Sequence, residues 1–393
     1  MSSFWTMLAA SIPDFLAFLA IASVGLLLYV YVGYPLLLAA LSSLRRRRRP
    51  EIGYTPKISV LIAAYNEEAA IARKIEQTLA LEYPKDKLEV VVVSDGSTDG
   101  TEAIVSAIDD PRVRLVKMPR RGGKTNAQNA AVKHCGGEVI VSSDATVTYH
   151  PKALLFLAAH YADPNVGAVS GRYKYFDPEE TSPTGLGSAA FWNYENMIKL
   201  FQSRIKTLTG CSGCIYSVRA SCYVPLWADA CSDLVEPLCI VRNGYRVAFE
   251  DRALAYEETT KNSSQEFKMR VRVATRGMRG LLSVPELLQP WRNAWTAFQL
   301  LSHKILRWMV PVLLIVLFAG CAANLGRTPF RVAFAMQVLF YLFVLASLAF
   351  PLHRRWKILG VPLFFCTLNA AFLVSMLELF RGRKFTTWET VRQ

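Results

Sequence analysis

The chain has 393 residues, of which 52% are hydrophobic and only 19% are charged. This composition excludes an intrinsically disordered chain, and the clustering of apolar residues in blocks argues against one ordinary soluble domain. The formal charge of +14 is compatible with binding to nucleic acid or to anionic lipid. The eight cysteines follow no disulfide framework, which predicts reduced and mostly packed thiols.

An N-terminal anchor is predicted over residues 1–50. Residues 15–41 carry no charge and exceed the ~20 apolar residues that cross a bilayer as a helix. Arginines fill positions 45–49, whereas residues 1–14 contain no Lys or Arg, so the N-terminus is expected outside. The alternative, a cleaved signal peptide, needs a positive region before the apolar run. Because the arginines abut a span, membrane lipid is the expected partner and nucleic acid is not.

Residues 51–283 alternate between short apolar runs and helix-like segments. Strands are expected at 57–64, 89–93, 113–116 and 139–142, and helices at 67–79, 101–108, 125–134 and from 151. This alternation predicts an α/β domain with an open, mostly parallel sheet. Ligands of such sheets bind beyond the carboxyl ends of the strands.

Polar residues follow each of the four expected strands. They are Tyr65-Asn66-Glu67 after Ala64, residues 94–100, residues 120–124 and residues 143–146. Each cluster alone is better explained as a turn, a helix cap or a solvated loop. Together, at one edge of one sheet, they predict a ligand site. Glu67 and Asp95 can accept hydrogen bonds from a base or ribose, and Asp144 can hold Mg²⁺ or Mn²⁺.

Gly122 and Gly123 would let the backbone approach a phosphate, to which Lys124 adds a positive charge. Gly123-Lys124-Thr125 looks like the end of a P-loop. Met118 stands where the P-loop spacing requires glycine, and no GxGxxG follows either early strand. The sequence therefore excludes the P-loop and dinucleotide-binding readings.

The C-terminal third is predicted to be membrane-associated. Residues 284–307 form an expected interfacial amphipathic helix with Trp291 and Trp295 on one face, although core packing fits the pattern equally. Residues 308–380 form an expected three-span bundle, followed by a tail at 381–393. Three crossings would put this basic tail outside, against the charge rule. Either the last block does not fully cross, or the rule is weak here.

With these features the chain resembles membrane-embedded family-2 glycosyltransferases with a GT-A catalytic domain. The relatives make hyaluronan, chitin oligosaccharides, poly-N-acetylglucosamine and cellulose. The resemblance implies a multi-pass protein of the bacterial inner membrane with a cytosolic catalytic domain. It implies inverting transfer of a hexosyl or N-acetylhexosaminyl group from a nucleotide-sugar, a UDP-sugar first, to a lipid-linked or polysaccharide acceptor. The alternative is an inactive nucleotide-sugar-binding relative that regulates a polysaccharide-export complex.

The resemblance also assigns nucleotide-sugar contacts. These are Ala64, Tyr65, Asn66 and Glu67 at the opening contact, Asp95 at uracil, and Gly123 and Lys124 at the diphosphate. Asp144 matches the first carboxylate of the DxD metal motif, but Thr146 replaces the second. The expected Mg²⁺ or Mn²⁺ would then rest on Asp144 and the phosphates.

Asp233 resembles the catalytic base of the family, with Glu236 as the nearby alternative and a helix cap as the structural reading. Arg272 matches the arginine of the QxxRW motif, whose Gln and Trp are replaced by Met269 and Val273. The missing Trp favours single transfer over processive synthesis.

Trp192 and Glu195 resemble an acceptor-side segment of the relatives. Aromatic rings stack on sugar faces, and a carboxylate binds hydroxyl groups. A packed core aromatic is the competing reading for this segment.

Overall fold

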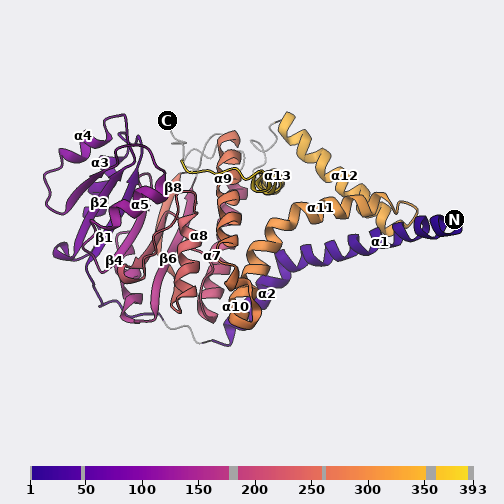
Figure 1. The fold of residues 1–393 in the computed structure, drawn as a ribbon, viewed down its shortest axis with the longest axis horizontal. Helices are drawn as coiled ribbons and strands as arrows, with labels where there is room; N and C mark the ends of the chain where they lie inside the picture. The colour runs from indigo at the N-terminus through magenta and orange to yellow at the C-terminus, as the bar shows by residue number, and fades with distance from the viewer. Residues whose placement is uncertain (1, 46–48, 177–184, 259–262, 351–359, 388–393) are drawn as a thin grey trace.

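The computed structural model describes residues 2–45, 49–176, 185–258, 263–350 and 360–387. In Figure 1 a sheet domain occupies the left side, and long helices extend from it to the N-terminus at the far right.

The domain is built on an eight-stranded sheet in the order β3-β2-β1-β4-β7-β6-β8-β5. The strands are β1 Ile58–Ala64, β2 Leu88–Ser94, β3 Val113–Lys117, β4 Val139–Asp144, β5 Thr148–Tyr149, β6 Val166–Phe176, β7 Ile215–Arg219 and β8 Arg246–Glu258. The half from β3 to β4 is parallel. In the other half, β7 is antiparallel to both β4 and β6, while β6 and β8 are parallel.

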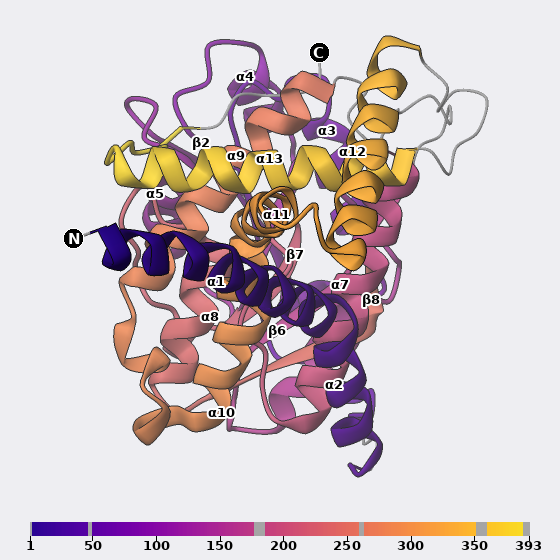
Figure 2. The same ribbon diagram turned by 90° about the vertical axis from the view of Figure 1, so that its right-hand side faces the viewer.

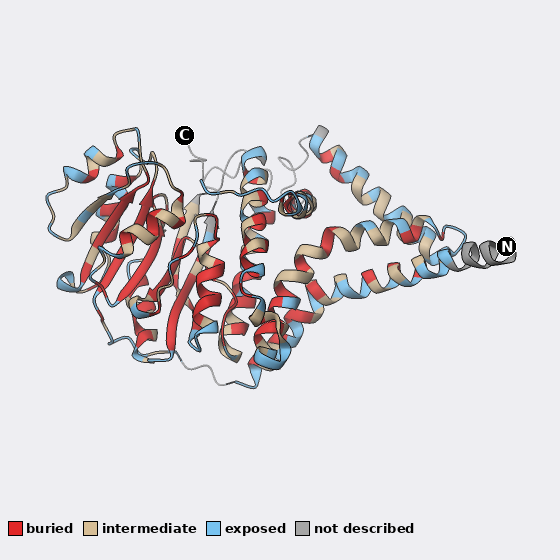
Figure 3. Cartoon of the chain, in the orientation of Figure 1, coloured by how far each residue is buried: buried red, intermediate tan, exposed pale blue. Residues whose placement is uncertain are grey.

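The parallel half confirms the predicted open α/β sheet. β1 (ISVLIAA) is buried along its whole length, and β2 (LEVVVVS) is nearly so, as expected for β-branched runs covered on both faces. Figure 3 shows these strands as the most continuously buried part of the chain. β6 was not predicted, because glycines and charged residues interrupt its apolar pattern.

Helices cover both faces of the sheet. α3 (Ile71–Leu79) and α6 (Ala153–Ala159) pack into one core cluster with alternate residues of β1, β2 and β4. α5 (Lys124–Val132) packs against the remaining residues of β1 and β2. The remaining helices of the domain are α4 Thr101–Ser106, α7 Gly185–Ile205, α8 Ser232–Arg242 and α9 Ser263–Leu282.

Four helical stretches are long and apolar enough to cross a membrane, by length and composition: Ile12–Ser43, Pro290–Ala322, Thr328–Leu348 and Gly360–Phe380. The first joins α1 (Ser2–Leu28) to α2 (Tyr34–Ser43) through a π-turn. The second joins α10 (Pro290–Leu300) to α11 (Leu306–Ala322) through another. The others lie in α12 (Thr328–Ala349) and α13 (Gly360–Phe380).

α1 and α11 pack closely against one another, and in Figure 2 α1 runs across the view beside α11, which is seen nearly end-on. A Cβ on Gly320 would lie only 2.6 Å from the carbonyl oxygen of Leu16, so a side chain there would push the helices apart. The amide of Asn324 donates to the carbonyl of Pro13 at 2.9 Å. These contacts make the two helices one unit.

α13 is oriented differently, since Figure 1 shows it end-on while α1 runs across the view. Near its start, Phe364 lies against Gly187 of α7. Near its end, the Ser375 hydroxyl donates to the carbonyl of Val271 in α9 at 3.1 Å. Beyond it, Arg279 donates to the carbonyl of Arg383 at 2.8 Å. Both ends of α13 therefore contact the sheet domain.

Candidate functional site

Asp95 lies directly after β2 and is fully buried. One carboxylate oxygen accepts the N–H of Gly122 at 2.7 Å, and the other accepts the N–H of Gly123 at 2.8 Å. Asp95 therefore holds the glycine loop in place. Each carboxylate oxygen keeps a second lone pair for a ligand donor.

The loops after β1 and β2 form one hydrogen-bonded unit. Asn66 has a left-handed backbone conformation (φ 53°), which asparagine tolerates better than most residues. Its side-chain oxygen accepts the N–H of Thr98 at 2.8 Å. The N–H of Glu67 donates to the hydroxyl of Thr101 at 2.8 Å. The structure thus brings together residues 65–67 and 94–101, as predicted from their places after the strands.

Gly123 is the N-cap of α5, with φ 93°. A Cβ at this position would collide with the carbonyl oxygen of Thr386, so the C-terminal tail passes directly over the glycine loop. The guanidinium of Arg121 lies 3.8 Å from the ring centre of Tyr65. The loop is therefore bounded by the tail on one side and by an aromatic ring on another.

Lys124, the first residue of α5, pairs with the carboxylate of Asp144 at the end of β4. Burial alone would lower the pKa of Lys124, but the charges of Asp144 and Asp233 outweigh it and hold this pKa above its ordinary value. Lys124 is therefore a cation, and both carboxylates act on it.

A third carboxylate, Glu257 of β8, reaches the same corner. The Thr146 hydroxyl lies 3.4 Å from one oxygen of Glu257, and the Tyr173 hydroxyl donates to the other at 2.6 Å. Burial lowers the pKa of Lys74 to about 7, against the opposing charges of Asp144 and Glu257. Glu257 was not among the predicted site residues, and its place near the end of β8 is the signal that could have found it.

Asp233 lies in the first turn of α8 and is half-buried. The helix-cap alternative is not what the structure shows, because the N-cap is Cys231 and has no side-chain cap hydrogen bond. The Cys231 thiol donates to one oxygen of Asp233 at 3.0 Å. A Cβ on Gly213 would lie 2.9 Å from the other oxygen. The glycine therefore keeps one face of this carboxylate open.

Glu236, the alternative base, is not brought to the site. Its side chain is buried in the interior, where it accepts the Tyr216 hydroxyl at 3.0 Å. Burial raises the pKa of Glu236 to about 8, although the hydrogen bond from Tyr216 opposes this. The two acidic residues of α8 therefore differ in environment within one turn.

Replacing Glu236 with Gln should remove a pH-dependent cost of folding. The folded chain keeps a proton on Glu236 that the unfolded chain releases above pH ~4.3. The wild-type free energy of unfolding is therefore unaffected by Glu236 below that pH, and Glu236 lowers it progressively as the pH rises toward about 8. Relative to wild type, Glu236→Gln should gain up to ~1.4 kcal/mol per pH unit across this window.

Thermal unfolding in detergent between pH 5 and 8.5 measures this gap. The matched control is Glu76→Gln, which changes an exposed carboxylate of α3 and should give a constant difference from wild type. A constant difference for Glu236→Gln as well would contradict the buried, protonated state.

Glu195 is also placed differently from the prediction. Its carboxylate extends from α7 into the interior, where it pairs with Arg307 of α11. It also lies 3.2 Å from the ring of His303, in the π-turn before α11. Burial would raise the pKa of Glu195, but Arg307 and His303 reverse this and hold it well below its ordinary range. The structure therefore gives the Glu195 carboxylate charged partners inside the protein, and an acceptor-side role for it stays a prediction.

Trp192 stays at the edge of the site. Its ring packs edge-on against Tyr173 at 4.5 Å between centres, and Tyr173 holds Glu257. The buried ammonium of Lys199 donates to the hydroxyl of Ser212, in the loop that faces Asp233, at 2.8 Å. Trp192 is therefore a packed aromatic residue that also lies next to the site, through Tyr173.

Arg272 lies half-buried on α9, and its neighbours one and two turns on make the contacts to the Asp233 side. Arg276 donates to the backbone of Asp229 at 3.1 Å, and Arg279 pairs with the Asp229 carboxylate at 2.7 Å. These two contacts hold α9 against Asp229, in the segment before α8. These contacts belong to Arg276 and Arg279, and the diphosphate- or acceptor-side role expected of Arg272 stays a prediction.

In the described ranges, no three His, Cys, Asp or Glu side chains gather as a metal site. All eight cysteines are free, and burial raises the thiol pKa of Cys211 and Cys214, so both are unreactive. A metal at this site would have to rest on fewer side chains and on the ligand itself.

Residues 59–223 match the model described as Glycosyl transferase family 2. The "Probable glycosyltransferase YdaM" of Bacillus subtilis (strain 168) is 30% identical over 237 residues, 56% of this chain and 54% of that protein. An N-acetylglucosaminyltransferase of Mesorhizobium japonicum is 25% identical over 344 residues, 83% of this chain and 79% of that one. The chain thus spans only about half of the first of these relatives.

A solved structure, the mannosyltransferase PcManGT from Pyrobaculum calidifontis in complex with GDP-Man and Mn²⁺, is similar with a TM-score of 0.69. It is 23% identical, and the match covers 94% of this chain and all of that one. This likeness confirms the predicted fold class.

Proposed function

Because residues 59–223 match the Glycosyl transferase family 2 model, we propose that the chain is an inverting glycosyltransferase. It transfers a sugar from a nucleotide-sugar to a lipid-linked or polysaccharide acceptor, and a UDP-sugar is the donor we propose. The observation that carries this proposal is the ion pair of Lys124 with Asp144 beside the loop that Asp95 holds, with the charge of Asp233 near enough to act on Lys124. A base, a diphosphate-binding cation and a nucleotide-side carboxylate are thus within one site.

In the proposed reaction, Asp233 accepts the proton of the acceptor hydroxyl as its oxygen bonds to the anomeric carbon. The bond from that carbon to the diphosphate breaks at the same time, and the nucleoside diphosphate leaves as an anion. A positioned base contributes typically ~10²–10⁴-fold in rate. Lys124, at the N-terminus of α5, opposes the charge of the leaving group together with the helix dipole.

A divalent cation bound here would neutralise part of the diphosphate charge. We propose that Glu257 replaces the second carboxylate that Thr146 lacks, so that Asp144 and Glu257 would hold the ion. The hydroxyl–carboxylate contact between Thr146 and Glu257 supports this assignment. Carboxylate oxygens are the donors that Mg²⁺ and Mn²⁺ prefer.

The proposed location is the bacterial inner membrane, with the sheet domain in the cytosol. α1, α11 and α12 cross the bilayer, and α13 lies along the sheet domain because both of its ends contact that domain. Two crossings after the domain then return the tail to the cytosol, which agrees with its contact to Gly123. Arg381, Arg383 and Lys384 are then inside, as the charge rule requires.

A reporter fused after residue 393 tests this arrangement in cells. Green fluorescent protein should fluoresce there, and a phosphatase that needs the periplasm should be inactive. The matched control places the same reporters at Gly326, in the turn between α11 and α12, where the opposite result is expected. Phosphatase activity after residue 393 would show that α13 crosses.

The activity itself is tested with the purified chain in lipid nanodiscs and a panel of UDP-, GDP- and other nucleotide-sugars with Mg²⁺ or Mn²⁺. Release of one nucleoside diphosphate, with labelled sugar appearing in lipid or polymer, is expected. Tight nucleotide binding without release from any donor would instead support the inactive, regulatory relative.

A further inference from the structure

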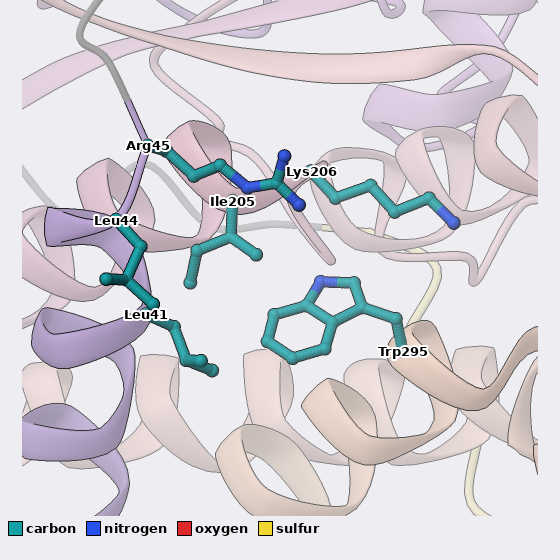
Figure 4. Close-up of a pocket in the computed structure, with 6 residues that line it drawn as sticks. All are labelled: Leu41, Leu44, Arg45, Ile205, Lys206 and Trp295. Atoms are coloured by element: carbon teal, nitrogen blue, oxygen red, sulfur yellow. The ribbon is translucent and has the colours of Figure 1, made fainter.

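A cavity of about 470 Å³ lies between the end of α2, the end of α7 and α10 (Figure 4). Its lining is Leu41, Leu44, Arg45, Ile205, Lys206 and Trp295. Apolar side chains form most of the wall, and two basic side chains reach across it. The cavity is therefore amphipathic.

The polar side-chain groups among the lining residues are all donors. In the described part of the chain, neither the Arg45 guanidinium nor the Lys206 ammonium has an ion-pair or hydrogen-bond partner. The indole N–H of Trp295 is shielded from solvent and has no acceptor among the described residues. In Figure 4 the nitrogen edge of this indole faces the two basic side chains. A shielded donor without a partner destabilises the fold, and an anion bound here would relieve that cost.

This cavity is separate from the candidate transfer site. Lys206 directly follows α7, near the beginning of β8, where the N–H of Leu208 donates to the carbonyl of Val247 at 3.0 Å. Glu257 lies ten residues farther along the same strand. β8 bulges on the way, and the β6 residues paired with Val247 and Glu257, Ala168 and Tyr175, are seven positions apart. At ~3.3 Å per residue, the two places are ~23 Å apart.

We propose that the cavity binds one anionic phospholipid from the adjoining leaflet. Its phosphate meets Arg45, Lys206 and the Trp295 N–H, and an acyl chain follows the leucines of α2. The cavity lies at the end of the apolar stretch Ile12–Ser43, where headgroups are expected. Leu44, in the lining, is 80% exposed, as is Trp291, four residues before Trp295 in α10. Side chains that enter lipid are exposed in this way.

Native mass spectrometry of the full chain in detergent tests this proposal, with phosphatidylglycerol and phosphatidylcholine of identical acyl chains in competition. Each basic residue near an anionic lipid contributes ~1 kcal/mol, so Arg45→Gln with Lys206→Gln should weaken phosphatidylglycerol binding ~30-fold. The matched control, Lys85→Gln with Lys133→Gln, removes the same charge from exposed positions of the sheet domain and should bind normally. Trp295→Phe keeps an aromatic ring, removes the N–H and should give an intermediate loss.

Three results would overturn the proposal. They are equal retention of both lipids, equal loss in the two double variants, and displacement of phosphatidylglycerol by millimolar inorganic phosphate alone. The last result would indicate a site for free anions. The inference depends on the proposed membrane insertion but not on sugar transfer, because lipid binding is the readout.

Discussion

Replacing Asp233 with Asn should lower the rate of sugar transfer ~10²–10⁴-fold, the range that a positioned base typically contributes. Asn has nearly the same shape but cannot accept the proton of the acceptor hydroxyl. Binding of the nucleotide should change little, since Asp95 and the glycine loop are untouched. The expected signature is therefore a reduced kcat with a donor KM close to that of the wild type.

The chain offers a matched control one helical turn away. Glu236→Gln removes a carboxylate from the same helix, yet this side chain faces Tyr216 in the interior. It should leave transfer within a few-fold of the wild type. Equal losses in both variants would point to damage to α8 as a whole. A fully active Asp233→Asn variant with an inactive Glu236→Gln variant would reverse the assignment.

The sequence predicted which residues lie together beyond β1, β2 and β4, because the signal there is local. Asn66, Asp95, Lys124 and Asp144 each lie close to the end of an expected strand, and parallel strands bring those ends to one edge. Pattern alone therefore placed residues that are far apart in the chain. This prediction did not require the packing of the residues between those strands.

The acceptor side could not be predicted in the same way, because its contacts join distant segments. Glu195 looked like a sugar-binding carboxylate, but its partner Arg307 lies 112 residues away and neutralises it. Glu236 and Asp233 differ in burial because of β7 and the Gly213 loop, which carry no helix or strand period that marks them as neighbours. The place of α13 likewise depended on its contacts, not on its length.

The Thr146–Glu257 contact gives the second strong prediction. Glu257→Gln should lower Mn²⁺ affinity in the presence of UDP at least ~10-fold, because losses of 10–100-fold are typical even for residues that only support a metal ligand. Asp144→Asn should do the same. Glu138→Gln, at the opposite end of β4, is the matched control and should bind Mn²⁺ normally. Electron paramagnetic resonance of free Mn²⁺ measures this directly, without a requirement for transfer.

A compensating exchange separates a metal-holding role from a structural one. Adding Thr146→Asp to Glu257→Gln returns a carboxylate to the same corner from β4's side, so at least part of the Mn²⁺ affinity should recover. A purely structural role of Glu257, through its bond with the Tyr173 hydroxyl, would not be rescued in this way. Unchanged Mn²⁺ affinity in Glu257→Gln, or no recovery in a folded double variant, would mean that Asp144 and the diphosphate hold the ion without Glu257.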